Sequence, residues 1–280
     1  MDAGDESGWQ PELRASDEEW ERVTLDTSKP TPARMYDYFL GGKDHFAVDR
    51  VAAAKVEEAT PDTFDIVWEN RHFLQRAVRY LAGQGVDQFL DLGTGLPTQG
   101  NVHEIAQEVN PDARVVYVDI DPIVLAHGRA LLATNPHTTV VTADMRDPKG
   151  VLGHPDVAGL LDFDRPVAVL FVAVFHFIRD TEDPAGIVRA FRDALAPGSY
   201  LALSHLTTEG PPAEAVARTE DAYANATSPM IFRPRTAVER LFDGFDLVEP
   251  GLVRPWQWRP DDAAKERTEW LYAGVGKLRS

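Results

Sequence analysis

The run QFLDLGTGLPT, residues 88–98, places a carboxylate and two glycines at the end of an apolar stretch. Its apolar side chains are typical of a buried strand, which Asp91 interrupts near the carboxyl end. Gly93 and Gly95 then permit backbone angles and a close approach that a Cβ would prevent. Because a helix is predicted to begin near Thr98, the run indicates a strand, turn and helix suited to binding a nucleoside-like cofactor.

Two later strands are also predicted to end in acidic residues. The run ARVVYVDIDP ends its strand at Asp119, which is placed to accept hydrogen bonds from both hydroxyls of a ribose. The run TTVVTADMRDP ends its strand at Asp144, where the exocyclic amine of an adenine is expected. Three consecutive strand ends with a carboxylate favour an adenosyl cofactor. The alternative is that Asp119 and Asp144 only cap helices.

The glycine spacing disfavours a nicotinamide dinucleotide. The dinucleotide fingerprint needs Gly or Ala where Thr98 stands, so that the helix can approach a pyrophosphate. A Tyr-x-x-x-Lys motif that would serve nicotinamide chemistry does not occur in the sequence either. The sequence therefore disfavours a nicotinamide-dependent oxidoreductase.

These motifs together resemble the class I methyltransferases. The match narrows with KPTPARMYDYFLGGKDHFAVDR at residues 29–50, ENRHFLQRAVRYL at 69–81 and PGSYLALSH at 197–205. From about Lys29 to the C-terminus, the chain resembles a family of S-adenosylmethionine-dependent methyltransferases long catalogued as a domain of unknown function. The resemblance implies the fold, the cofactor S-adenosyl-L-methionine and its product S-adenosyl-L-homocysteine, and leaves the substrate open.

Histidines end two of the predicted strands. The fourth strand, VAVLFVAVFHFIRD, leads to His176 beside the expected methyl group. This position resembles that of the catalytic base in a large group of O-methyltransferases, whose motif also has an Asp four residues later, here Asp180. A histidine suits that role because its ordinary pKa lies near working pH. His205, which ends the fifth strand, is a second candidate. Either histidine could instead be a packing residue.

The cofactor and the substrate also need cationic and aromatic partners. Arg34, Lys43 and Arg71 are candidates to hold the methionyl carboxylate, although each could belong to a salt bridge of the helical segment. Trp256 and Trp258 could stack on a substrate or pack a hairpin. The predicted substrate pocket contains Tyr36, Phe39, Phe175, His176 and His205. The predicted cofactor residues are Arg71, Asp91, Leu92, Gly93, Thr94, Gly95, Asp119, Ile120, Asp144 and Met145.

An alternation of strands and helices must position these residues. It predicts a Rossmann-like, doubly wound α/β sheet, which the resemblance orders 3-2-1-4-5-7-6 with an antiparallel last strand. Residues 207–234 are expected to form a substrate wall. We expect an acidic arm over 1–29 with a short helix at 16–23, a helical lid over 30–69 and a methyltransferase domain over 70–280. Helices are predicted at 31–40, 46–58, 70–81 and 101–109, and strands at 88–92, 114–119, 138–142, 166–173, 199–204, 245–249 and 270–277.

Composition limits the remaining function classes. The chain has 280 residues, a formal net charge of −17 and no cysteine. The acidic balance opposes binding to nucleic acid, and the lack of cysteine excludes disulfides, thiolate metal sites and a cysteine nucleophile. We find no metal motif, signal peptide or apolar run of about 18 residues, and so expect a cytoplasmic protein that binds neither metal nor membrane.

The sequence is most consistent with an S-adenosylmethionine-dependent methyltransferase that modifies an oxygen of a small molecule. A non-catalytic or regulatory S-adenosylmethionine-binding protein is the alternative. A polar group beside the methyl distinguishes the two, and His176 at that position favours the enzyme.

Overall fold

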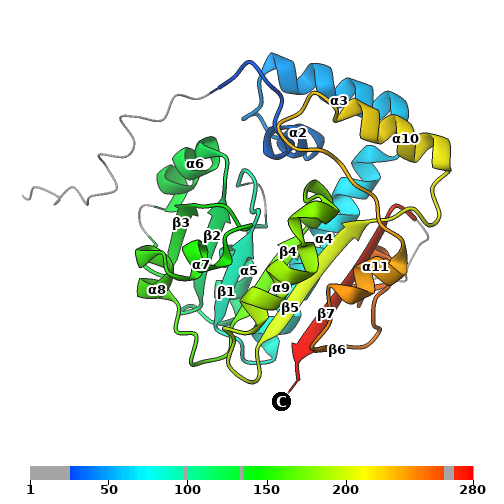
Figure 1. Cartoon of the computed structure of the whole chain (residues 1–280). Helices are drawn as coiled ribbons and strands as arrows, with labels where there is room; N and C mark the ends of the chain where they lie inside the picture. Colours follow the sequence, from blue (N-terminus) through cyan, green and yellow to red (C-terminus); the bar gives the residue numbers. More distant parts are fainter. Residues whose placement is uncertain (1–25, 98–99, 133–134, 262–267, 280) are drawn as a thin grey trace, which may run out of the picture.

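A computed structural model describes residues 26–97, 100–132, 135–261 and 268–279. They form a seven-stranded sheet in the order β3-β2-β1-β4-β5-β7-β6, as predicted (Figure 1). β7 runs antiparallel to β5 and β6, while β1 to β5 pair in parallel. The strands are β1 Gln88–Leu92, β2 Arg114–Asp119, β3 Thr138–Thr142, β4 Ala168–Val172, β5 Tyr200–Leu206, β6 Phe245–Leu247 and β7 Leu271–Leu278.

Helices cover both faces of the sheet because side chains of each strand alternate between two apolar clusters. Leu90 and Leu92 of β1 pack in one cluster, and Phe89 packs in the other. The cluster of Phe89 is covered by α4 (Thr63–Gly83) and α5 (Val102–Val109), while α6 (Pro122–Leu132) lies against β3. The opposite cluster is covered by α7 (Pro148–Leu152), α8 (Pro155–Leu160), α9 (Pro184–Arg192) and α11 (Arg235–Arg240).

A third group of helices lies beyond the carboxyl ends of the strands. It contains α2 (Pro32–Phe39), α3 (Ala47–Ala59) and α10 (Ala213–Ala222), which lie together at the top of Figure 1. Their apolar faces form a cluster with Ile66 and Val67 of α4 and with Trp270 and Leu271 at the start of β7. We call α2 and α3, with the loop between them, the lid.

One predicted helix boundary is wrong. α4 begins at Thr63 rather than at residue 70, because Ile66 and Val67 continue its buried stripe under the lid. α5 begins at Val102, in agreement with the predicted range 101–109, while Thr98 lies outside the described residues. Asn101 caps this helix, and Glu104 accepts a hydrogen bond of 2.7 Å from the Asn101 backbone N–H.

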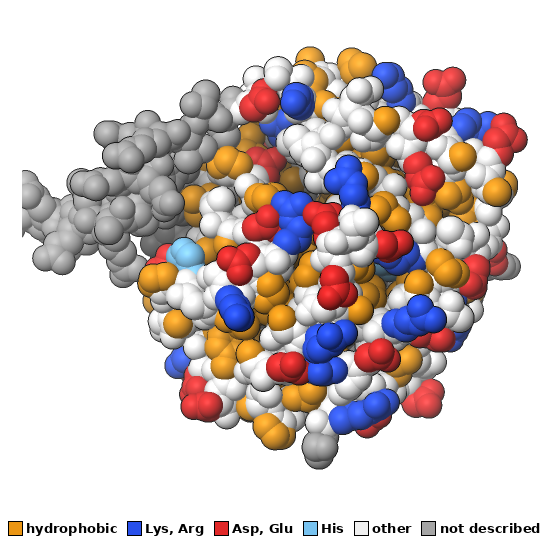
Figure 2. Space-filling model, in the orientation of Figure 1, with side chains coloured by type: hydrophobic (Ala, Val, Ile, Leu, Met, Phe, Trp, Pro, Cys, Tyr) orange, Lys and Arg blue, Asp and Glu red, His pale blue; other side chains and the backbone are white. Residues whose placement is uncertain are grey.

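The surface mixes charges of both signs. Figure 2 shows acidic and basic side chains interspersed over one face of the molecule. Across the described ranges, no helix combines the length and apolar character needed to cross a membrane. The helix predicted at residues 16–23 lies outside the described residues.

Candidate functional site

The turn after β1 brings the chain against the end of β4. Gly93 has a φ of 73°, and a Cβ added there would lie 2.2 Å from Cγ2 of Val174. A side chain at this position would therefore both strain the backbone and collide with its neighbour. Gly95 has a φ of 67°, but a Cβ there would meet nothing within 4 Å. The turn thus leaves open space beside Gly95.

Asp119 holds this turn from the end of β2. Its Oδ2 accepts a hydrogen bond of 2.8 Å from the Gly95 N–H, and its Oδ1 accepts one of 2.9 Å from the Asp121 N–H. Burial raises the pKa of Asp119 to about 6, against the opposing effect of these backbone donors. Each carboxylate oxygen keeps lone-pair capacity for a ribose hydroxyl. The neighbouring Ile120 is 57% exposed and could contact an adenine.

Arg71 and Asp91 lie together on the other side of the turn. They line a cavity of about 660 Å³, its mouth included, with Thr94, whose hydroxyl donates to the Asp91 carbonyl oxygen at 3.3 Å. Burial raises the pKa of Asp91 to about 6, and the charge of Arg71 opposes that rise. Arg71 itself comes from α4 and donates to Oδ1 of Asn101 at 3.3 Å. Of the three cationic candidates, Arg71 is therefore the one beside the glycine turn.

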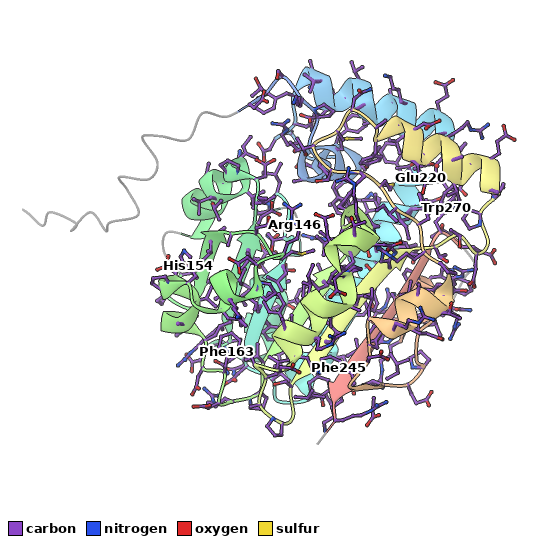
Figure 3. The ribbon with its side chains drawn as sticks, viewed as in Figure 1. Arg146, His154, Phe163, Glu220, Phe245 and Trp270 are labelled. Atoms are coloured by element: carbon purple, nitrogen blue, oxygen red, sulfur yellow. The ribbon has the colours of Figure 1, made fainter. Side chains whose placement is uncertain are left out.

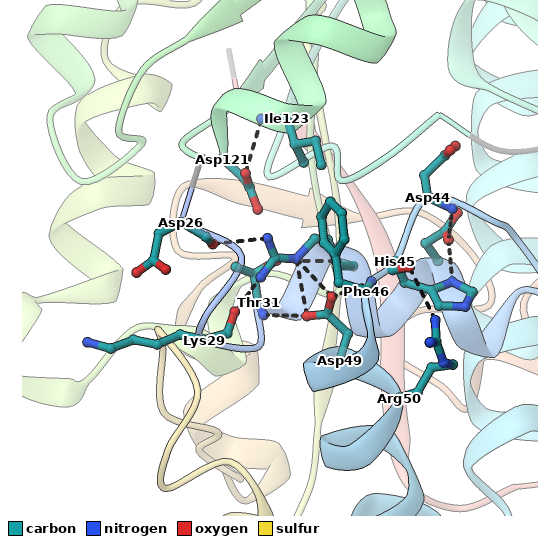
Figure 4. A network of polar contacts seen from close by, with 12 residues as sticks. Asp26, Lys29, Thr31, Asp44, His45, Phe46, Asp49, Arg50, Asp121 and Ile123 are labelled. Carbon is teal, nitrogen blue, oxygen red and sulfur yellow. Dashed lines mark hydrogen bonds and ion pairs between the residues drawn. The ribbon is translucent and has the colours of Figure 1, made fainter. Parts of the chain in front are cut away.

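Arg34 forms a salt bridge of the helical segment, which was the predicted alternative to a role with the methionyl carboxylate. Its guanidinium pairs with the buried Asp49 at 3.1 Å and also donates to the carbonyl oxygens of Asp26 and Lys29. Asp49 further accepts from the Phe46 N–H at 2.8 Å. Figure 4 shows this network, which ties the segment before α2 to the start of α3.

Lys43 is exposed in the loop between the lid helices. That loop is shaped by Asp37, whose Oδ2 accepts from the Asp44 N–H and contacts Nδ1 of His45, both at 2.9 Å. A Cβ on Gly42 would lie 1.9 Å from Oδ1 of Asp37. The GGKDH part of the motif is therefore a lid turn that needs a glycine and an aspartate.

Asp144 is engaged by a neighbouring cation at the end of β3. Arg146 donates to both of its carboxylate oxygens at 2.7–2.9 Å and to Glu182 at 2.9 Å. These bonds lower the pKa of Asp144 although partial burial raises it. Figure 3 shows Arg146 between the lid and the helices below. The side chains of Met145 and Leu92, two of the predicted cofactor residues, are both buried in the core.

A second cavity lies between the lid and the sheet edge. It encloses about 570 Å³, its mouth included, within the range of roughly 300–1,000 Å³ typical of small-molecule pockets. Its wall contains the predicted Tyr36, Phe39 and His176. Residues 207–234 supply four more side chains, in agreement with their predicted position, namely Thr219, Tyr223, Met230 and Phe232.

His176 contributes a ring without a hydrogen-bond partner to this wall. It lies in the 3-10 turn Phe175–Phe177 after β4 and is 4% exposed, and its Nδ1 is fully buried and unpaired. Burial, together with the nearby His205 and the positive Arg233, lowers the pKa of His176 well below its ordinary value. The ring is therefore neutral at pH 7 and can accept a proton or a hydrogen bond.

His205 has a structural role in this arrangement. An arginine can only donate, so Nη1 of Arg233, at 2.7 Å, donates to Nε2 of His205. Nδ1 then carries the proton and donates to the Leu206 carbonyl oxygen at 2.6 Å. Burial lowers the pKa of His205 to about 3, and Arg233 adds to this effect. His205 keeps no lone pair for a substrate proton, which argues against its predicted roles as base and pocket residue.

Three aromatic candidates for contact with a substrate do not line this cavity. Phe175 is fully buried in the core, with its ring centroid 4.6 Å from that of Phe171, and Phe177 lines the cavity in its place. Trp258 is fully buried and packs edge-on against Phe73, and the indole of Trp256 donates to the Thr268 carbonyl oxygen at 3.0 Å. Both tryptophans therefore pack the region before β7.

The wall residues that were not named from the sequence include Asn70, Tyr223 and Trp270. Asn70 extends from α4, Tyr223 follows α10, and Trp270 precedes β7. Figure 3 shows Trp270 below α10. Only Tyr223 had a usable signal, because it lies within residues 207–234, already expected to border the site. Trp270 resembles any aromatic residue at the start of an edge strand.

Comparisons with known proteins agree with this geometry. A family model described as S-adenosyl methyltransferase matches residues 18–279. A structure of a candidate methyltransferase from Thermobifida fusca YX shares 46% identity and a TM-score of 0.87, covering 93% of this chain and 99% of that one. A DUF574 family protein from Streptomyces avermitilis MA-4680 shares 42% identity and a TM-score of 0.87, covering 91% and 100%. The search of curated proteins gives no match.

Proposed function

Since the chain belongs to the S-adenosyl methyltransferase family and uses S-adenosylmethionine as its methyl donor, we propose that it methylates an oxygen atom of a small molecule. The acceptor would lie in the cavity under the lid. The observation that carries this proposal is the neutral, unpaired ring of His176 in the cavity wall.

The cavity and the cofactor turn are neighbours. Val174 lies against Gly93 of the turn, and Ala173 and His176, on either side of Val174 in the chain, line the cavity. Arg71 of the cofactor side and Asn70 of the cavity side are adjacent on α4. An acceptor in the cavity is therefore within reach of a donor held at the turn.

The described residues offer partners for each part of the cofactor. Asp119 would bind the ribose, Ile120 the adenine and Arg71 the methionyl carboxylate, beside the open space at Gly95. When bound, the cofactor supplies an electrophilic methyl group on a sulfonium. The chain then aligns the acceptor and excludes water. His176 would accept the acceptor proton at a ring nitrogen.

Within the predicted lid segment 30–69, the lid formed by α2, α3 and the loop between them would cover this donor. Ala33 of α2 and Phe46 at the start of α3 pack against Leu96 of the turn and against Ile123 and Val124 of α6. Since these contacts span the carboxyl ends of β1 and β2, opening the lid would expose the cofactor side of the site, and closing it would exclude water.

A product assay tests the oxygen acceptor. The full chain is incubated with isotope-labelled S-adenosylmethionine and phenols, carboxylic acids and amines, and the methylated atom is identified by mass spectrometry and NMR. We expect O-methyl products that decrease with His176→Ala. The control is His137→Ala, which removes a partly exposed histidine paired with Asp112 at 3.6 Å. Methylation only at nitrogen or carbon, unchanged by His176→Ala, would overturn the proposal.

A further inference from the structure

The cavity under the lid has no charged side chain among the described residues of its wall. None of its described lining residues is Lys, Arg, Asp or Glu. Those that could ionise are Tyr36, Tyr223 and His176. Burial raises the pKa of both tyrosines and lowers that of the histidine, so all three are neutral at pH 7. An ion that entered this cavity would lose its hydration without gaining a counter-charge.

Most polar atoms of the wall already bond to one another. The hydroxyl of Thr60 donates to that of Thr219 at 2.6 Å, because Thr219 itself donates to the Ala215 carbonyl oxygen at 2.8 Å. The amide of Asn70 donates to the Tyr36 hydroxyl at 2.8 Å. Among the described lining residues, this leaves Nδ1 of His176, the Tyr223 hydroxyl and the Trp270 indole N–H without a hydrogen-bond partner in the structure.

Aromatic rings make up much of the remaining wall. Pairs of these rings pack against each other with centroids 5.9 Å apart, Phe177 with Tyr223 and Phe232 with Trp270. Flat apolar surfaces of this kind favour a flat apolar ligand, through offset and edge-to-face contacts. The rings that face the cavity are Tyr36, Phe39, Phe177, Tyr223, Phe232 and Trp270.

We propose that the acceptor is an uncharged aromatic molecule with a free hydroxyl group, and that the cavity rejects carboxylates and ammonium ions of the same shape. The aromatic body would lie among the rings, and its hydroxyl would meet His176 and Tyr223. This inference rests on the proposed function, because it assigns the acceptor to the cavity under the lid.

A matched ligand series tests the proposal by binding alone. The probes are 2-naphthol, 2-naphthoate and 2-naphthylmethylammonium, which share one apolar body and differ in charge at pH 7. Their affinities for the full chain are measured by calorimetry with saturating S-adenosylhomocysteine. We expect 2-naphthol to bind at least about 10-fold more tightly than either ion, equivalent to about 1.4 kcal/mol. An ion that binds as tightly as 2-naphthol would overturn the proposal.

A charge placed in the wall gives a second test. Val56→Lys adds an ammonium group to α3 at a lining position, whereas Val51→Lys makes the same change on α3 at a side chain that is 63% exposed. We expect Val56→Lys to shift the preference toward 2-naphthoate by about 10-fold or more, and Val51→Lys to leave it unchanged. Equal shifts in both variants would contradict the cavity assignment. The ligand series needs no variant, so it remains decisive if Val56→Lys does not fold.

The binding and product assays separate this inference from the proposed function. If 2-naphthol is the preferred ligand but methyl groups go only to nitrogen or carbon, the oxygen acceptor is wrong and the uncharged aromatic class stands. If 2-naphthoate binds equally well and oxygen is still methylated, the proposed function stands and the charge selectivity is wrong.

Discussion

The side-chain amide of Asn70 donates a hydrogen bond of 2.8 Å to the hydroxyl of Tyr36 and so joins α4 to the lid. The Oδ1 atom of the same amide accepts a hydrogen bond of 2.5 Å from the Ser204 hydroxyl. Ser204 in turn accepts from the Ala173 N–H at 2.9 Å. Ala173 has a φ of 58°, which is strained for a residue with a Cβ. This series of hydrogen bonds connects the lid to Ala173, which follows β4 and lies three residues before His176.

Removing the Ser204 hydroxyl, which lies at the centre of these hydrogen bonds, should destabilise the protein. Ser204 is fully buried, and Ser204→Ala leaves Oδ1 of Asn70 and the Ala173 N–H without their partner, so we expect the free energy of unfolding to fall by about 1–3 kcal/mol. Urea unfolding of the full chain measures this loss. Ser28→Ala, at an exposed serine, is the control and should change stability by less than about 0.5 kcal/mol. Equal stabilities would show that the chain of hydrogen bonds contributes little.

The buried carboxyl of Asp91 should make stability depend on pH. Its pKa is about 6 in the folded chain and 3.8 in a model compound, so folding favours the protonated form. This contribution is fully present below pH 3.8 and is lost as pH rises through about 6. Asp91→Asn cannot ionise, so its stability relative to the unmodified chain should increase between pH 4 and pH 7. Denaturant titrations across that range measure the difference. A constant or decreasing difference would contradict the raised pKa.

Loss of the Asp119 carboxylate should weaken cofactor binding. Asp119→Ala removes the acceptor of the Gly95 N–H and the proposed acceptor of the ribose hydroxyls, so we expect a loss of about 1.5–3 kcal/mol for S-adenosylmethionine. Calorimetry with folded protein gives the value. Unchanged affinity would reject the ribose assignment, and Asp112→Ala at an exposed carboxylate serves as the control for lost surface charge.

Cofactor binding should protect the lid. Ala33 and Phe46 contact the glycine turn and α6, and the lid loop reaches α6 again where Asp44 lies 3.5 Å from His127. We therefore expect slower hydrogen exchange over residues 31–58 when S-adenosylhomocysteine is present. Residues 184–192 of α9 lie on another face and provide an internal control. Equal exchange of residues 31–58 in both states would make the segment a fixed scaffold.

The strands of the sheet could be predicted well, because the alternation of apolar residues and the turn residues that mark a strand lie within a few neighbouring positions. The end of β2 at Asp119 and the bounds of β1 and β3 agree with the predicted ranges, whereas β4 is shorter than predicted, at Ala168–Val172. The glycine turn was recognisable for the same reason, because a φ of 73° at Gly93 leaves few other residue types.

Side-chain pairing over long sequence distances could not be predicted in this way. His205 looks like a base from its strand position, and only the fold shows that Arg233, 28 residues later, occupies its Nε2. Arg34 looks like a free cation until Asp49 is placed beside it. Such pairs depend on how helices and strands pack, which one sequence does not specify locally.

We expect His176 to be the base in the methyl-transfer step. If its ring accepts the acceptor proton, His176→Ala should lower kcat by about 10² to 10⁴ and leave S-adenosylmethionine affinity nearly unchanged. Burial, His205 and Arg233 lower its pKa, so we expect kcat to be flat near pH 7 and to decline only well below pH 6.5, where the ring becomes protonated. Steady-state kinetics with the acceptor found in the product assay, from pH 4.5 to 8, measure both effects, and His137→Ala should match the unmodified chain. A raised KM with kcat kept would instead make His176 a wall residue that only positions the acceptor.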